Sequence, residues 1–370
     1  MHQFSVPPAE ARLLFSSDRV FSSSPDISAL KLRAGETIAF LDLGEMAAVV
    51  GGKAIAGRDD GPQPPLPEQI MDAFMRAGTG PEGYGLVTSR LALFPHLTVR
   101  ENIALPLREG LPGAEISARV ARVLALTGLE AEADLKPMQL GQEGRIRVAL
   151  ARGLVTGAST VVLDYPFRGL DHAERSQLVA RIRRLKSSWG FSLVLLTGER
   201  DEALLMADRI GVIADGVLLQ TGRPDELFDR PADACVAVGF GDAVLLRGIV
   251  IDEENDIVRV RLAAGVVVCA TSGGVLTPGM LVDVCVRPGR ITPVFGAKPD
   301  DETATLIGTL ASVVQMADVF RLVFRLPDGG EVIVHRPSVL GSRNMRPGSE
   351  ACLVWQENAA VAFPSAADKG

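Results

Sequence analysis

Two patterns of apolar and polar residues divide the chain at about residue 240. In the first part, short apolar runs alternate with longer segments whose apolar positions recur at helical spacing. The runs are ETIAFL (36–41), TVVLD (160–164), FSLVLLT (191–197) and RIGVIA (209–214). Apolar strands that alternate with helices are typical of a parallel sheet, so this part is predicted to be an α/β domain.

The second part consists of short alternating segments separated by glycine and proline. LLRGIVI (245–251), LVDVCVRPGRI (281–291) and VFRLVFRLPDGGEVIVH (319–335) are examples. This spacing predicts a small all-β domain of barrel type, with PDDETAT (299–305) as a linker between two β subregions. We therefore expect one domain at 1–240 and another at 241–370.

Helical spacing of apolar residues runs from about Ser117 to Leu135, with arginines between them. A second helical pattern, RIRRLKSSWG (181–190), is strongly basic. Its most economical interpretation is the solvated face of a helix, not a patch for a membrane or a nucleic acid.

Composition fits a folded protein with a large core. The chain has 370 residues, of which 47% are hydrophobic and 22% charged, enough for at least two domains. A net charge of −7 argues against a nucleic-acid partner. No apolar run approaches the ~20 residues of a spanning helix, and no basic-then-apolar signal opens the chain, so we expect an unsecreted, cytoplasmic protein. The four cysteines and four histidines are scattered, and we expect no metal site.

Several segments, in one consistent order, resemble the ATPase subunits of ATP-binding cassette (ABC) transporters. TVVLDYPFRGLD (160–171) resembles the Walker B strand and D-loop, and LALFPHLTVRENIALPL (91–107) the segment after the Q-loop in sugar, polyamine and ferric-iron importers. GRIRVALARGLV (144–155) resembles the helix after the ABC signature, and residues 199–231 the stretch after the switch histidine. VCVRPGRI (284–291) resembles part of the transport-associated OB-like (TOBE) domain.

This resemblance implies an α/β fold with an ABC-ATPase-like, P-loop NTPase core. It also implies a helical subdomain at about 95–155 and a small all-β, OB-like TOBE domain at 241–370.

The phosphate-binding loop departs from the family pattern. A P-loop needs glycine-rich backbone, a lysine for the terminal phosphates and a hydroxyl for magnesium. Here Ala48 stands at the lysine position and Val49 at the hydroxyl position, while Asp42 adds a negative charge that repels phosphate. An alternative alignment on Gly52 and Lys53 places the loop too far beyond the strand. The degenerate loop is thus expected at Asp42, Gly44, Ala47, Ala48 and Val49.

The other nucleotide positions depart in the same way. Tyr165 occupies the position of the glutamate general base, and a phenol with a pKa of ~10 cannot take that role at neutral pH. Ser89 stands at the Q-loop glutamine and Gly198 at the switch histidine. The signature reads Gly141, Gln142, Glu143 and Gly144, with the Glu143 carboxylate expected to face the phosphate. Only Asp164 and Asp171 are retained.

The resemblance implies a pseudo-ATPase subunit of an importer. It would lie on the inner face of the plasma membrane, bound to ABC permease subunits, and pair with a catalytically competent ATPase paralogue. No cofactor is expected, and MgATP would bind only if the degenerate site or the partner's composite site accepts it. The permease-docking residues are expected to be Leu93, Phe94, Pro95, His96, Leu97, Thr98, Glu101 and Asn102.

Other interpretations stay open. Each single departure is also compatible with sequence drift or a misplaced alignment. The chain could be a regulatory or sensor module that acts through its C-terminal β domain, or a subunit that binds ATP weakly. A rebuilt nucleotide site with enzymatic activity is a further possibility, although Tyr165, Glu143 and Ser89 form no recognisable catalytic set.

Overall fold

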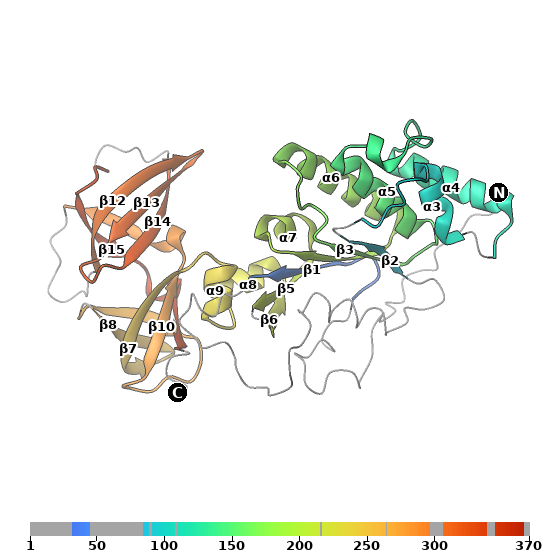
Figure 1. Cartoon of the computed structure of the whole chain (residues 1–370). Helices are drawn as coiled ribbons and strands as arrows, with labels where there is room; N and C mark the ends of the chain where they lie inside the picture. The colour runs from blue at the N-terminus through green and yellow to red at the C-terminus, as the bar shows by residue number, and fades with distance from the viewer. Residues whose placement is uncertain are drawn as a thin grey trace. The chain divides into compact units, whose positions relative to one another are not determined.

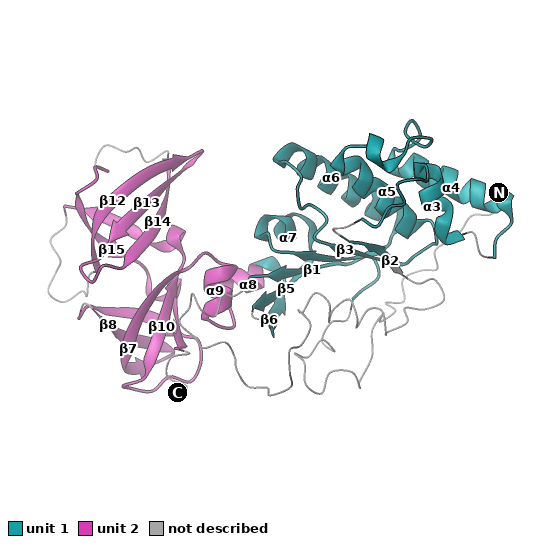
Figure 2. Ribbon diagram, viewed as in Figure 1, with its two compact units in different colours: residues 1–44, 59–224 teal, residues 45–58, 225–370 magenta. Residues whose placement is uncertain are grey.

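The computed structural model describes residues 32–44, 84–88, 91–107, 110–214, 217–263, 265–296, 306–338 and 345–365. The chain forms two compact units, which divide between Pro224 and Asp225 (Figure 2). Short helix α9 (Ala234–Gly239) packs in the second unit against the strand that contains Cys285. The domain limits expected from the sequence, including the boundary at 240 and 241, stay predictions.

In the described residues of the first unit, a six-stranded sheet has the order β2-β3-β4-β1-β5-β6. All neighbours pair in parallel except β5 and β6. The inner strands are buried along nearly their whole length, as the apolar runs predicted. The strands are β1 (Thr37–Asp42), β2 (Tyr84–Val87), β3 (Thr160–Asp164), β4 (Ser192–Thr197), β5 (Arg209–Ala214) and β6 (Val217–Gly222).

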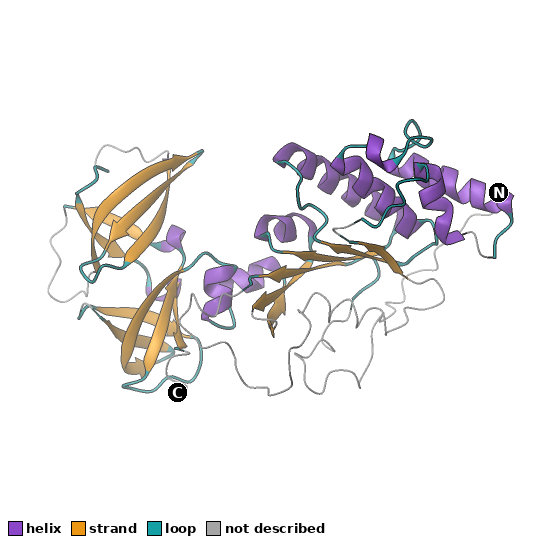
Figure 3. Cartoon of the chain, viewed as in Figure 1, coloured by secondary structure: helices purple, strands orange, loops and turns teal. Residues whose placement is uncertain are grey.

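The helices that the structure describes in this unit, α3 to α7, lie over one face of the sheet (Figures 1 and 3). The helix predicted at about 117–135 begins earlier and ends earlier than expected. It ends at Thr127 because Gly128 adopts a left-handed φ of 65° and caps it. The helices are α3 (Val99–Ala104), α4 (Gly113–Thr127), α5 (Gln142–Leu154), α6 (His172–Trp189) and α7 (Arg200–Met206).

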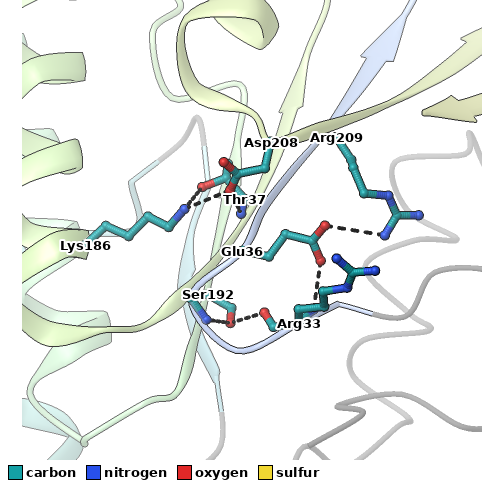
Figure 4. A network of polar contacts seen from close by, with 8 residues as sticks. Arg33, Glu36, Thr37, Lys186, Ser192, Asp208 and Arg209 are labelled. Atoms are coloured by element: carbon teal, nitrogen blue, oxygen red, sulfur yellow. Dashed lines mark hydrogen bonds and ion pairs between the residues drawn. The ribbon is translucent and has the colours of Figure 1, made fainter. Parts of the chain in front are cut away.

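Polar contacts tie the amino ends of β1, β4 and β5 together (Figure 4). The Thr37 N–H donates to Asp208 Oδ2 at 2.8 Å, and Lys186 at the end of α6 also contacts Asp208, at 3.2 Å. These contacts lie at the end of the sheet opposite the predicted nucleotide positions. The residues labelled in Figure 4 are Arg33, Glu36, Thr37, Lys186, Ser192, Asp208 and Arg209.

The second unit starts within α8 (Pro224–Asp229) and contains a closed barrel with the strand order β10-β16-β9-β8-β7. Buried and exposed residues alternate along these strands, as expected for a barrel with one face in the core. The barrel strands are β7 (Val244–Glu254), β8 (Ile257–Leu262), β9 (Val267–Ser272), β10 (Leu281–Val286) and β16 (Ala360–Pro364).

A five-stranded antiparallel sheet, with the order β11-β15-β12-β13-β14, shares one hydrophobic core with the barrel. The all-β architecture agrees with the sequence prediction, whereas the linker expected at 299–305 lies outside the described residues. The strands are β11 (Thr292–Phe295), β12 (Leu306–Met316), β13 (Val319–Arg325), β14 (Glu331–Pro337) and β15 (Glu350–Val354).

Candidate functional site

The carboxyl ends of β1, β3 and β4 meet at one edge of the first sheet. In the strand register, Asp164 lies opposite Leu196, and Leu41 lies opposite Thr197. The sheet therefore brings the segments that follow Asp42, Asp164 and Thr197 together. In open α/β sheets, ligands bind outside this edge.

Tyr165 links all three strands at this edge. Its backbone N–H donates to the Leu196 carbonyl at 3.0 Å, and its hydroxyl donates to Asp42 Oδ2 at 3.1 Å. Its φ of 46° lies in the left-handed region, which costs a residue with a side chain about 1–2 kcal/mol. The Arg168 guanidinium lies 4.8 Å from the centre of the Tyr165 ring. The contacts with Leu196, Asp42 and Arg168 thus offset the backbone strain.

Burial, reinforced by the Asp42 carboxylate, raises the pKa of Tyr165 to about 12. Burial also raises the pKa of Asp164, and the positive charge of Arg168 opposes that shift. At neutral pH, Tyr165 is therefore a neutral hydrogen-bond donor.

Asp42 is bound on both of its carboxylate oxygens. Oδ2 accepts the Tyr165 hydroxyl, and Oδ1 accepts the Gly44 N–H at 2.9 Å, where Gly44 has a left-handed φ of 63°. The backbone after β1 thus turns back toward the side chain of Asp42, the last residue of that strand. The predicted positions Ala47, Ala48, Val49 and Ser89 lie outside the described residues, so their assignments stay predictions.

Gly198 follows β4 and lies beside the Tyr165 ring. A Cβ added there would lie 3.8 Å from Tyr165 Cε1 and 3.7 Å from the Asp42 carbonyl oxygen, which are ordinary contacts. The backbone therefore leaves room for a Cβ at this position, and a longer side chain would share the edge with Tyr165.

A buried carboxylate, Glu202, lies on α7 just beyond Gly198, and sequence analysis missed it. Its Oε2 accepts the Thr197 hydroxyl, and Arg175 Nε lies 3.4 Å from its Oε1. Burial is the main cause that raises its pKa. Its position in the helix could have indicated its burial, because Glu202 lies on the same buried face of α7 as Ala203 and Met206.

The signature residues lie at the start of α5, with Gly141 as the N-cap and Gly144 buried against Leu140. The Gln142 amide donates to the Arg168 carbonyl at 3.5 Å, which brings the signature close to the loop after β3 in the same chain.

The Glu143 carboxylate, which the sequence predicts to face a phosphate, is paired with arginines of its own chain. Glu143 Oε2 accepts from Arg147 Nε at 2.9 Å, and Arg181 Nε lies 3.6 Å from Oε1. Arg147 in turn donates to the Gly128 carbonyl at 2.9 Å and pairs with Glu132. Two arginines therefore hold this carboxylate between α5 and α6.

Asp171 caps α6. Its Oδ1 accepts the Glu174 N–H at 2.8 Å, and Glu174 Oε2 accepts the Asp171 N–H at 3.1 Å. This reciprocal capping box gives the aspartate a role in helix stability that needs no nucleotide.

The predicted docking residues form one ordered segment. Buried Asn102 accepts the Phe94 N–H at 2.8 Å and donates to the carbonyls of Phe94, Leu97 and Thr98. Thr98 and Glu101 form a capping box at the start of α3. These contacts leave Phe94, Pro95 and His96 exposed at the tip.

Among the residues that the structure describes, no helix combines the length and the apolar character that a membrane-spanning segment needs. Within the same ranges, no group of three or more His, Cys, Asp and Glu side chains is arranged to hold a metal ion.

Comparison with known proteins gives matches over both units. A family model described as "TOBE domain" matches residues 284–363. The "Spermidine/putrescine import ATP-binding protein PotA" of Rubrobacter xylanophilus is 31% identical over 340 residues, which cover 90% of this chain and 88% of that protein. The protein of the same name from Mesorhizobium japonicum is 32% identical, over 76% of this chain and 71% of its own. Among solved structures, the chain is similar to cbiO1 from Clostridium perfringens, which is described as part of the ABC transporter complex cbiONQ. The two are 26% identical with a TM-score of 0.41, over 54% of this chain and 81% of the cbiO1 chain.

Proposed function

Because this chain belongs to the family of ATP-binding subunits of ABC importers, we propose that it is a pseudo-ATPase member that docks on a permease and pairs with a competent ATPase paralogue. It would act on the cytoplasmic face of the membrane, held there by the permease.

The hydrogen bond from Tyr165 to Asp42 carries this proposal. Tyr165 stands where the family resemblance expects a glutamate base, and a neutral phenol cannot accept a proton from the attacking water. The bond also keeps the Asp42 carboxylate at the edge where phosphates would lie. At an effective dielectric constant of about 20, two like unit charges about 4 Å apart repel by about 4 kcal/mol. The described side chains at this edge therefore do not fit a nucleoside triphosphate.

The signature side supports the same proposal. In this family each composite ATP site combines the P-loop of one subunit with the signature of the other. The Glu143 carboxylate pairs with Arg147 and Arg181, and as an ionised group it has no proton to donate to a phosphate. We therefore expect at most one working site in a heterodimer. A single-turnover assay on the complex would give at most one ATP hydrolysed per heterodimer, and two equivalent turnovers would refute the proposal.

For the solute, we propose a polyamine or a compound of similar cationic chemistry. The support is the sequence similarity to two proteins whose names describe spermidine and putrescine import. Deleting the gene for this chain should reduce uptake of radiolabelled spermidine, and restoring it should recover the uptake. Unchanged spermidine uptake would rule out this solute class without affecting the docking proposal.

Docking is tested by affinity capture of the tagged full-length chain from detergent-solubilised membranes. Permease subunits and a second ATPase should co-purify with the chain. The Phe94→Asp variant changes an exposed side chain at the docking tip and should lose the permease. Val275→Asp is the matched control, because it makes the same charge change at an exposed apolar residue of the second unit. If the wild-type chain captures neither the permease nor an ATPase, the proposal is wrong.

A further inference from the structure

The docking segment begins with two consecutive residues in an unfavourable backbone conformation. Leu91 and Ala92 have φ angles of 56° and 42°, in the left-handed region that usually requires glycine. The Leu91 N–H donates to the carbonyl of Thr88, the residue after β2, at 2.8 Å. Such a conformation persists only where surrounding contacts hold it.

Arg152 on α5 binds the backbone of Leu91 and Ala92. Its Nη1 donates to the Ala92 carbonyl at 2.7 Å, and its Nη2 donates to the Leu91 carbonyl at 3.0 Å. The rigid planar fork of a guanidinium suits two carbonyls that are fixed side by side. Partial burial lowers the pKa of Arg152, and the two carbonyls replace the water that its cation loses.

The exposed tip lies between two side chains that bind the backbone on either side of it, which we call anchors. The first anchor is Arg152, and the second is Asn102. Asn102 on α3 holds the segment from Phe94 to Thr98. Phe94, Pro95 and His96 thus project between two fixed points, one of which belongs to the helix that starts at the signature residues. Neither anchor is one of the tip residues, so each holds the tip without adding to its exposed surface.

We propose that Arg152 is a positioning residue that couples α5 to the docking tip Phe94–His96. A displacement of α5 would carry the carbonyls of Leu91 and Ala92 with it and reorient the tip. The contact itself is independent of any partner, whereas its role in docking rests on the proposed function.

The test uses amide hydrogen exchange on the full-length chain with Arg152→Lys, which keeps the charge but loses the fork. Exchange at Leu91 and Phe94 should rise on the order of tenfold, the ratio expected from losing about one net hydrogen bond. Exchange in the buried strand β4 should not change, which separates a local positioning effect from general destabilisation. Arg119→Lys on α4 is the matched control, because Arg119 pairs only with nearby Glu115 among the contacts described for it.

Capture of the permease from detergent extracts is the second measurement. Arg152→Lys should weaken capture, whereas Arg119→Lys should leave it unchanged. Unchanged exchange at Leu91 and Phe94, an equal rise in β4, or full capture despite the local rise would each overturn the inference. If the wild-type chain captures no permease, the proposed function fails, and the exchange measurement still decides whether Arg152 holds the backbone of Leu91 and Ala92.

Discussion

At the scale of single residues, Tyr165 and Asp42 illustrate what the sequence reveals and what it leaves open. The family resemblance placed a tyrosine at the position of the catalytic base. It did not reveal that this tyrosine donates a hydrogen bond to Asp42, because the two are 123 positions apart and meet only through the register of three strands. The arginine contacts of Glu143 could not be predicted for the same reason. Its partner Arg181 lies on another helix, so its orientation depends on tertiary packing.

The first prediction concerns the ionisation of Tyr165. The chain has two tyrosines, so the tyrosinate absorbance of the wild type minus that of Tyr165→Phe isolates this group. The midpoint should be about 12, because burial and the Asp42 charge raise the pKa. The stabilisation by the neutral phenol is complete below the ordinary pKa of ~10 and is lost as the pH rises through the folded value. The Asp42→Asn variant removes the neighbouring charge and should lower the midpoint. A midpoint near ~10, measured where circular dichroism shows an intact fold, would contradict this description.

At the scale of elements, the strands follow from the sequence more directly than the helix ends. Runs of apolar residues identified β1, β3, β4 and β5 because a buried parallel strand has few polar positions. The helix expected to reach Leu135 stops at Gly128, where backbone freedom outweighs the continuing apolar pattern. The two hydrogen bonds from Arg152 to the carbonyls of Leu91 and Ala92 could not be predicted, because nothing in the local sequence marks these two non-glycine residues as left-handed.

The capping box of α6 yields a second prediction. Asp171→Ala should lower the free energy of unfolding of the first unit by about 1 kcal/mol, because the N–H of Glu174 loses its acceptor. Asp171→Asn keeps a side-chain oxygen and should stay close to the wild type. Urea unfolding followed by the fluorescence of Trp189, in a Trp355→Phe background, measures this difference. Equal losses in both variants would show that the charge of Asp171, not its capping oxygen, matters.

Close packing of β2 against α5 yields a third prediction. A Cβ at Gly85 would lie 2.8 Å from the carbonyl oxygen of Gly153, so Gly85→Ala forces the strand and helix apart. The same fluorescence assay should show a loss of about 1–3 kcal/mol, the usual cost of overpacking. Gly113→Ala at the start of α4 is the control, because a Cβ there meets nothing within 4 Å. A Gly85→Ala variant as stable as Gly113→Ala would contradict the packing described.

At the scale of the whole molecule, the fold class followed from the sequence: an α/β unit with a mainly parallel sheet, followed by an all-β unit with a closed barrel. The family membership agrees with the motifs that suggested it. The loss of ATP chemistry is a proposal. It rests partly on the described side chains at the sheet edge, Asp42 and Tyr165. It also rests on the loop positions Ala48 and Val49, which lie outside the described residues.

The most direct test of this proposal is calorimetric titration of the full-length chain with MgATP up to about millimolar concentration, the upper end of usual substrate affinities. The same titration of a variant with Ala48→Lys and Val49→Ser is the matched comparison, since it restores the lysine and hydroxyl that a P-loop uses. We predict no saturable heat for the natural chain. Saturable binding of MgATP by the natural chain, with an affinity within that range, would contradict the proposal that its nucleotide site no longer functions.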